Sequence, residues 1–476
     1  MSAAIIWFRR DLRLIDHPAL DAAVQSGLPV IALYVHAPEE EGEWRSGAAT
    51  EWWLHHSLTA LDAQLRERGG RLIVRRGPAF AAITQLIGET GAVAVHWNRL
   101  YEPAAIARDQ TIKQQLKADG FIAESHNAAL FVEPWQVSTQ TGQPYRVFTP
   151  FWRNAVTKIA DVLPLPAPND LRFADAGLPS ESIASLNLLP TIRWDSGMAA
   201  TWTPGEQGAL ARLRDFVDHA TRYSKERDRP DLVGTSMLSP HLHFGELSPR
   251  QILAALQLEA QGDPGWMDRV EHYVRELGWR EFAHHLLFHY PHTPNANLNT
   301  QFDEFPWATP DDALLAAWQR GRTGIPIVDA GMRQLWETGW MHNRVRMIVA
   351  SFLTKNLRYH WIHGARWFWD TLVDADLAAN TLGWQWAGGT GADAAPYFRI
   401  FNPVLQGERF DPDGVYVKRF VPELAQVPAS VLHKAWTLKP SEQATFGVRD
   451  VYARPMLDLA KTRDAALLAY ASIKRL

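Results

Sequence analysis

The sequence predicts a two-domain protein, in which an α/β domain with a doubly wound parallel sheet precedes an all-α domain. Up to about Ser125, short runs rich in β-branched and aromatic residues alternate with helix-like stretches, as they do in βαβ units. From Glu206 onward the apolar residues follow a helical period instead. At 476 residues the chain is also too long for one ordinary core.

Residues 1–130 supply the expected sheet and its covering helices, one of which is predicted from Ala49 to Glu67. The expected strands are Ile5 to Phe8, Val30 to Val35, Leu72 to Arg75 and Val93 to Trp97. Residues 131–205 are rich in proline and show no sustained period, which indicates a long connecting segment. Residues 206–476 form the expected helical domain, whose helices are separated by further prolines.

Composition excludes several classes of protein. Without cysteine there is no disulfide and no thiolate nucleophile or metal ligand, and the chain does not start like a secretory signal, so we expect a cytoplasmic protein. No apolar run approaches the roughly 20 residues that cross a bilayer, so no membrane partner is expected. The net charge of -4 means that any nucleic-acid surface is a local basic patch. We expect a monomer and assign no metal ligands.

Known catalytic motifs are missing from the N-terminal part. The first strand runs into Phe8 to Arg13 without the glycines of a dinucleotide-binding turn, which disfavours a nicotinamide-dependent oxidoreductase. The chain also lacks H-E-x-x-H, G-x-S-x-G and Walker motifs. The chemistry is therefore expected in the helical half.

Two stretches of that half have the composition of a binding site. Thr235 to Ser239 offers hydroxyls and backbone N–H groups at a turn, which suits a phosphate, although taken alone an ordinary helix N-cap is the more frequent interpretation. The tract from Asp374 to Trp386 combines two acids, an amide and two indoles around small residues. If it is helical, Asp376, Asn380 and Trp384 lie close to one face.

This tract resembles the signature of the DNA photolyase and cryptochrome family, in its branch close to plant cryptochromes. Trp7 to Arg13, Thr235 to Arg250 and Thr323 through Arg344 extend the resemblance over the whole chain. It implies an enzyme that repairs cyclobutane pyrimidine dimers in UV-damaged DNA, by light-driven electron transfer from reduced FAD to a flipped-out dimer. The alternative is a blue-light receptor of cryptochrome type; such members often carry a tail, so an end at Leu476 favours the enzyme.

The resemblance also implies the cofactor contacts. Thr235 to Ser239 are expected to hold the phosphates, Asp374 to pair with Arg346, Asp376 to face the ring, and Asn380 to lie beside flavin N5. The full expected set is Tyr223, Thr235, Ser236, Met237, Leu238, Ser239, Tyr273, Arg280, Arg346, Asp374, Asp376 and Asn380. Trp384, Trp361 and Trp307 match the family's chain of electron-transferring tryptophans, and Trp307 aligns only with a one-residue insertion.

The lesion is expected on a second set of residues. Glu276 and Trp279 match the positions that hold and stack on the dimer, and Asn343 and Met347 lie one helical turn apart. Relatives that repair the pyrimidine–pyrimidone photoproduct carry histidines at the last two positions, so this chain is expected to split cyclobutane dimers. The expected catalytic residues are Glu276, Asn343, Met347 and Asn380, and DNA phosphates are expected on Arg344 and Arg399, with Lys225 and Arg227 as further candidates.

An antenna pigment is expected in the N-terminal domain. The Asn-Glu pair that follows Tyr101-Glu102 in folate-binding bacterial relatives is replaced by Pro103-Ala104-Ala105. Gly47 to Leu54 and Ser239 to Glu246 are more similar to the branch that holds methenyltetrahydrofolate differently. This folate is therefore a candidate antenna without assigned residues.

Overall fold

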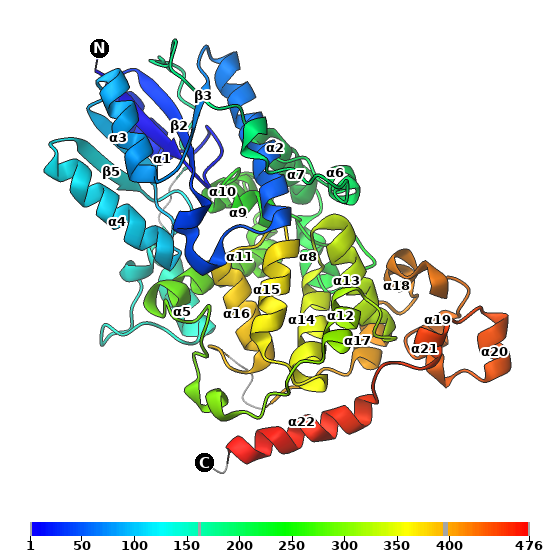
Figure 1. Cartoon of the computed structure of the whole chain (residues 1–476). Helices are drawn as coiled ribbons and strands as arrows, with labels where there is room; N and C mark the ends of the chain where they lie inside the picture. The colour runs from blue at the N-terminus through cyan, green and yellow to red at the C-terminus, as the bar shows by residue number, and fades with distance from the viewer. Residues whose placement is uncertain (1, 160–162, 394–397, 475–476) are drawn as a thin grey trace.

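The computed structural model describes residues 2–159, 163–393 and 398–474, and it has the predicted α/β domain followed by a helical domain (Figure 1). The sheet has the order β3-β2-β1-β4-β5 and all of its pairs are parallel. Its strands are β1 (Ala4–Phe8), β2 (Val30–His36), β3 (Leu72–Arg76), β4 (Ala94–Asn98) and β5 (Ile122–His126). Helices α1 (Pro18–Gln25) and α2 (Ala48–Glu67) cover one face, and α3 (Ala79–Thr90) and α4 (Pro103–Ala118) cover the other.

Burial on both faces explains why the central strands are apolar throughout. Ala4, Ile6 and Phe8 of β1 pack in one core, whereas Ile5 and Trp7 pack in the other. The edge strand β5 is absent from the predicted strands because it contains polar residues and has one neighbour only.

The connecting segment contains a helix that the sequence does not predict, α5 (Phe148–Val156). Phe148, Phe151, Trp152 and Ala155 are buried on one of its faces, which packs against α11 (Trp266–His289). A nine-residue helix gives too short a pattern to stand out between prolines. The short α6 (Ser196–Thr201) follows, and the 3₁₀ turns up to this point are Pro38–Trp44, Pro134–Gln136 and Ala184–Leu186.

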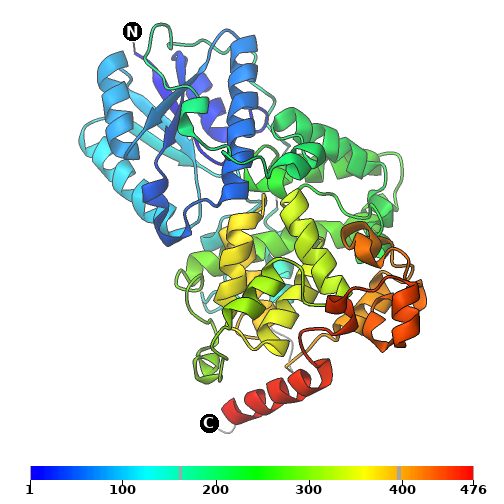
Figure 2. The same ribbon diagram turned by 45° about the vertical axis from the view of Figure 1, so that its right-hand side comes forward.

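The helical domain lies below the sheet domain in both views (Figures 1 and 2). Besides α11, its helices are α7 (Glu206–Val217), α8 (Tyr223–Glu226), α9 (Ser239–His243), α10 (Pro249–Ala260), α12 (Asp312–Gln319), α13 (Pro326–Thr338), α14 (Asn343–Ser351), a π-helix (Phe352–Asn356), α15 (Trp361–Thr371), α16 (Leu377–Gly388), α17 (Pro403–Phe410), α18 (Val415–Phe420), α19 (Ala429–Leu432), α20 (Pro440–Thr445), α21 (Asp450–Ala453) and α22 (Leu459–Ile473). Its 3₁₀ turns are Ala220–Arg222, Thr300–Glu304, Pro422–Leu424 and Ala435–Thr437. None of the described helices has the length and apolarity of a membrane span.

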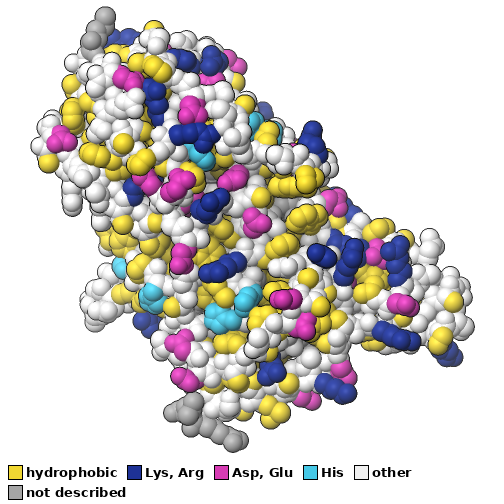
Figure 3. Space-filling view, viewed as in Figure 1, with side chains coloured by type: hydrophobic (Ala, Val, Ile, Leu, Met, Phe, Trp, Pro, Cys, Tyr) yellow, Lys and Arg dark blue, Asp and Glu magenta, His cyan; other side chains and the backbone are white. Residues whose placement is uncertain are grey.

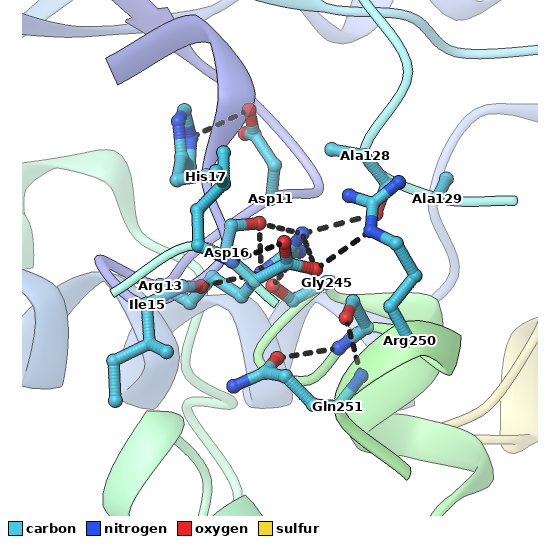
Figure 4. A network of polar contacts seen from close by, with 12 residues as sticks. Asp11, Arg13, Ile15, Asp16, His17, Ala128, Ala129, Gly245, Arg250 and Gln251 are labelled. Carbon is cyan, nitrogen blue, oxygen red and sulfur yellow. Dashed lines mark hydrogen bonds and ion pairs between the residues drawn. The ribbon is translucent and has the colours of Figure 1, made fainter. Parts of the chain in front are cut away.

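A buried polar network joins the two domains (Figure 4). Arg13, which follows β1, donates to the carbonyl oxygens of Gly245 (2.8 Å) and Ala128 (3.0 Å). Arg250 of α10 donates to the Asp16 carboxylate at 3.0 Å. The side chains of Arg13 and Asp16 are each 1% exposed, so the network fixes the sheet domain against α9 and α10.

Candidate functional site

A cavity of about 510 Å³ lies among α11, α14, α15 and α16. This volume is in the range of about 300–1,000 Å³ that is usual for small-molecule sites. Many of the predicted site residues line it, although they are spread from position 239 to position 384 in the sequence. They are Ser239, Glu276, Trp279, Arg280, Asn343, Arg346, Met347, Asp374, Asn380 and Trp384, and Arg227 joins them.

Arg346 and Asp374 form an ion pair in the wall of the cavity. Nη2 of Arg346 lies 2.9 and 3.1 Å from the two carboxylate oxygens, and its Nε donates to the Met341 carbonyl at 2.7 Å. Asp374 comes just before α16 and Arg346 is on α14, so the pair also links these two elements. The guanidinium is held in one orientation and presents a fixed positive charge.

Asn380 and Asp376 differ in where they point. Nδ2 of Asn380 donates to the Ala365 carbonyl at 3.0 Å, which fixes the amide in the cavity wall. Asp376 instead caps α16, and its carboxylate lies 3.5 Å from Nε2 of His284 and 3.9 Å from Nδ1 of His243. Burial acts to raise the pKa of Asp376, but the neighbouring His284 and His243 hold it well below its usual range. Asp376 is not among the described lining residues, so its contact with a flavin stays a prediction.

Glu276 and Trp279 stand on the α11 side of the cavity. Arg227 donates to the Glu276 carboxylate and so holds it in place. The Trp279 ring stacks on Phe148, with centroids 3.9 Å apart and planes 9° from parallel. Helix α5 of the connecting segment thus supports Trp279, the predicted stacking residue, through Phe148.

Asn343 and Met347 line the facing wall from α14, whereas His342 and Arg344 do not. Asn343 is exposed and Met347 is half-buried. Arg344 forms an ion pair with Asp228 at 2.7 Å and lies over the Phe410 ring at 4.5 Å. His342 is the N-cap of α14, and burial lowers its pKa to about 4.

The turn before α9 presents adjacent backbone N–H groups. Met237 has a φ of 51° in the left-handed region, and Leu238 at the N-cap of α9 is helical. Successive residues of opposite hand form a concave N–H nest that suits an anion. No side chain caps α9, so Thr235 and Ser236 do not act as its N-cap.

Tyr223 and Tyr273 pack edge to face near this turn, with ring centroids 5.1 Å apart. Burial raises the pKa of both phenols, which are therefore neutral at ordinary pH. The Arg227 guanidinium lies over the Tyr223 ring at 5.3 Å, which connects this pair to the cavity lining. Neither tyrosine is among the described lining residues.

The three predicted tryptophans differ in exposure, from the buried Trp384 and Trp361 to the half-buried Trp307. Trp384 is 3% exposed and lines the cavity, and Trp361 is fully buried with Nε1 donating to Asn297 at 2.7 Å. His360 lies between Trp361 and Trp307, with ring centroids 5.2 and 5.1 Å from theirs. Trp307 is only half-buried, so the series ends near the surface.

The outlying cations are separate from this cavity. Arg399 is exposed and lies over Phe401 at 5.0 Å, where it lines a neighbouring pocket of about 210 Å³. Lys225 is also exposed. On the face shown in Figure 3, Lys and Arg side chains are interspersed with Asp and Glu, so no single sign of charge dominates it.

Other lining residues escape the sequence-based prediction. Phe368 and Leu372 of the α15 region contribute apolar surface, and no motif marks them. Ala379 is one of the small residues expected to let a flat ring approach, and Gly383 and Ala387 continue the row along α16 at a spacing of four residues that is visible in the sequence. This small-residue face, the fixed Arg346 and the N–H nest fit a molecule with a flat ring and phosphates, as FAD has.

A second cavity, of about 240 Å³, lies between the two domains. Its lining includes the aromatic residues Trp7, Tyr34 and Trp44 together with the acids Glu41 and Glu51. Burial raises the pKa of the Glu51 carboxyl. The cavity suits a flat heterocycle with hydrogen-bond donors at its edge.

The chain matches the family described as DNA photolyase over residues 4–169, and the family described as the FAD binding domain of DNA photolyase over residues 273–472. It is 47% identical over 475 residues to a deoxyribodipyrimidine photo-lyase of Agrobacterium fabrum, which covers 99% of this chain and 98% of that protein. It is 39% identical to cryptochrome-1 of Arabidopsis thaliana, over 97% of this chain and 69% of that protein. The crystal structure of a class III photolyase from Agrobacterium tumefaciens superposes with a TM-score of 0.95 at 46% identity, and the match covers 100% of this chain and 98% of that one.

Proposed function

The chain belongs to the DNA photolyase and cryptochrome family and is an enzyme of the photo-lyase type, and from this premise we propose that it splits cyclobutane pyrimidine dimers in DNA. One observation favours the cyclobutane dimer over other DNA lesions as the substrate. Asn343 and Met347 line the same cavity as Glu276 and Trp279, and neither is an acid that could protonate a substrate. Splitting a cyclobutane dimer by electron transfer needs no such acid.

The proposed cofactor, FAD, supplies the excited-state electron donor when it is bound and reduced. Arg346, fixed by Asp374, would hold an electronegative edge of its ring system, and Asn380 would hydrogen-bond close by. The N–H nest at Met237 and Leu238, with Ser239 at the cavity wall, would bind its phosphates. The small residues of α16 leave room for a flat ring.

The lesion side of the cavity would receive the flipped dimer. Flipping a nucleotide out of the duplex costs a few kcal/mol, and less at a damaged step. Stacking on an aromatic side chain stabilises the flipped state by about 1–3 kcal/mol per base. Trp279 supplies that surface, and Phe148 behind it keeps the indole in place. Glu276 and Asn343 offer polar groups to the edge of the bases, and Arg344 and Arg399 are proposed to meet DNA phosphates.

We further propose that Trp384, Trp361 and Trp307 carry an electron between the surface and the cavity. The exposure of the two end residues supports this route, because Trp384 lines the cavity and Trp307 is partly exposed to solvent. The interdomain cavity is the proposed site of a methenyltetrahydrofolate antenna, since its acids would pair with the donor edge of a pterin. Monomeric action and a cytoplasmic location stay predictions.

The test is illumination of the reduced, FAD-loaded protein with an oligonucleotide that contains one thymine dimer. Chromatography should show light-dependent loss of the dimer and none in the dark. An oligonucleotide with a pyrimidine–pyrimidone photoproduct is the matched control and should stay intact. If the dimer persists under light while the flavin is reduced, the repair proposal is wrong and a receptor of cryptochrome type is favoured.

A further inference from the structure

Two histidines and a glutamate gather on the N-terminal sheet, away from the residues that line the three cavities described above. His96 is in β4, and Glu124 and His126 are in the edge strand β5. The register pairs His96 with Glu124 and Asn98 with His126. Because alternate residues of a strand share a face, all three side chains project from the same side of the sheet.

The distances among these side chains are close to those of a metal site. Nδ1 of His96 and Nε2 of His126 lie 3.7 and 4.0 Å from the same oxygen of Glu124, and one ligand atom from each residue lies within 4.8 Å of the others. Tetrahedral ligands at about 2.0–2.2 Å from a metal are about 3.3–3.6 Å apart. Small side-chain rotations would therefore complete the geometry.

Both imidazoles present an unpaired nitrogen toward this point. Nδ1 of His96 and Nε2 of His126 are buried and have no hydrogen-bond partner among the described residues, and the His96 side chain is only 5% exposed. Buried polar atoms are normally paired, so these two nitrogens are free to accept a ligand.

We propose that His96, Glu124 and His126 bind one divalent transition-metal ion, with Zn²⁺ as the favoured occupant. Two imidazole nitrogens and one carboxylate suit zinc and its neighbours rather than Mg²⁺ or Ca²⁺, which prefer oxygen ligands throughout. The Glu124 side chain is 55% exposed, so a fourth position faces solvent and takes water. The bound ion would tie the edge strand β5 to β4 and stabilise the sheet domain.

The test is a calorimetric titration of chelator-treated, FAD-loaded, untagged full-length protein with Zn²⁺. We expect one site per chain, at least about tenfold weaker binding in Glu124→Gln and in His126→Ala, and a zinc-dependent rise in Tm that these two variants lack. His292→Ala is the control, because His292 is exposed and outside the cluster. Replacement of Zn²⁺ by Co²⁺ should give the visible absorption of a four-coordinate site.

Glu124→Gln keeps this test decisive even if a histidine variant misfolds, because its side chain is largely in solvent. Equal zinc affinity in the native chain and in Glu124→Gln would overturn the proposal. So would the absence of saturable binding below millimolar zinc, which would leave the cluster as an ordinary polar contact between a carboxylate and two imidazoles.

Discussion

At the scale of single residues, Trp384 shows how packing and a proposed electronic role coincide in one side chain. Its ring lies against Gly364 and makes an edge-to-face contact with Phe368 at 4.9 Å. A second tryptophan, Trp318, is fully buried, and its ring centroid lies 6.2 Å from that of Trp384. Burial alone therefore does not distinguish a tryptophan that transfers electrons from one that fills the core.

Trp384→Phe should remove most of the light-driven reduction of bound, oxidised FAD, because phenylalanine is much harder to oxidise than tryptophan. Repair by enzyme whose flavin is reduced beforehand should persist. Absorbance under blue light measures the first, and chromatography of a dimer-containing oligonucleotide measures the second. Trp318→Phe is the matched control and should keep photoreduction; equal loss in both variants would contradict the assignment.

Glu281 on α11 links stability to pH. Its carboxylate accepts the N–H groups of Phe131 (3.0 Å) and Val132 (3.2 Å), and burial raises its pKa to about 7. Since the folded state binds the proton more tightly than the unfolded state, its contribution is fully present below the unfolded pKa near 4.5 and is lost as the pH rises through about 7.

Glu281→Gln should therefore flatten the fall in stability between pH 5 and pH 8, by at most about 3 kcal/mol. Urea unfolding at several pH values measures the effect. Glu259→Gln changes an exposed carboxylate of α10 and should leave the pH dependence as in the native chain. An unchanged slope in Glu281→Gln would show that Glu281 does not titrate in this range.

At the scale of elements, the close approach of α15 and α16 forms one side of the cavity. A side-chain carbon placed on Gly364 of α15 would lie 2.0 Å from the Trp384 ring of α16. The helices can therefore pack at this distance only with glycine at position 364. The same contact places Asn380, one turn before Trp384, within hydrogen-bonding distance of the Ala365 carbonyl.

Gly364→Ala should destabilise the helical domain by about 1–3 kcal/mol, because the extra carbon overpacks the contact. Thermal unfolding followed by circular dichroism measures this loss, and the affinity for FAD should fall with it. Gly88→Ala in α3 is the control: nothing lies within 4 Å of its added carbon, so it should gain about 0.5–1 kcal/mol. Similar effects of the two substitutions would rule out the steric explanation.

At the scale of the whole molecule, the polar network around Arg13 fixes the sheet domain to the helical domain (Figure 4). Arg13 is enclosed by carbonyl oxygens from residue 128 and from residue 245, which belong to different parts of the chain. The Asp16 carboxylate forms ion pairs with both Arg13 and Arg250. The relative position of the two proposed chromophores therefore depends on this contact.

Arg13→Met should destabilise the protein by about 3–5 kcal/mol, since it leaves Asp16 and several carbonyl oxygens buried with fewer partners. Urea unfolding followed by circular dichroism and by flavin fluorescence should show this loss. Arg66→Met removes an exposed ion pair with Asp62 and should change stability by about 1 kcal/mol or less. A small effect of Arg13→Met would mean that other contacts hold the domains together.

The sequence by itself determined the fold class, the family and the residue types of the site, because periodicity and motifs are local properties of a chain. It did not reveal α5, whose apolar face is one short pattern, or β5, whose polar residues do not read as a strand. The position of Asp376 toward the ring stays a prediction, and the tertiary structure adds that its carboxylate lies near His243 and His284.

Only the tertiary structure decided which of the predicted residues share a cavity and which distant side chains become neighbours. Phe148 supports Trp279 across more than a hundred residues of sequence, and His96 meets Glu124 and His126 only because two strands pair in one register. Such contacts depend on how elements pack, and packing is set by the sum of many weak interactions along the whole chain. A local sequence pattern does not contain this information. The sequence therefore indicated candidate residues, and the tertiary structure decided which of them lie together.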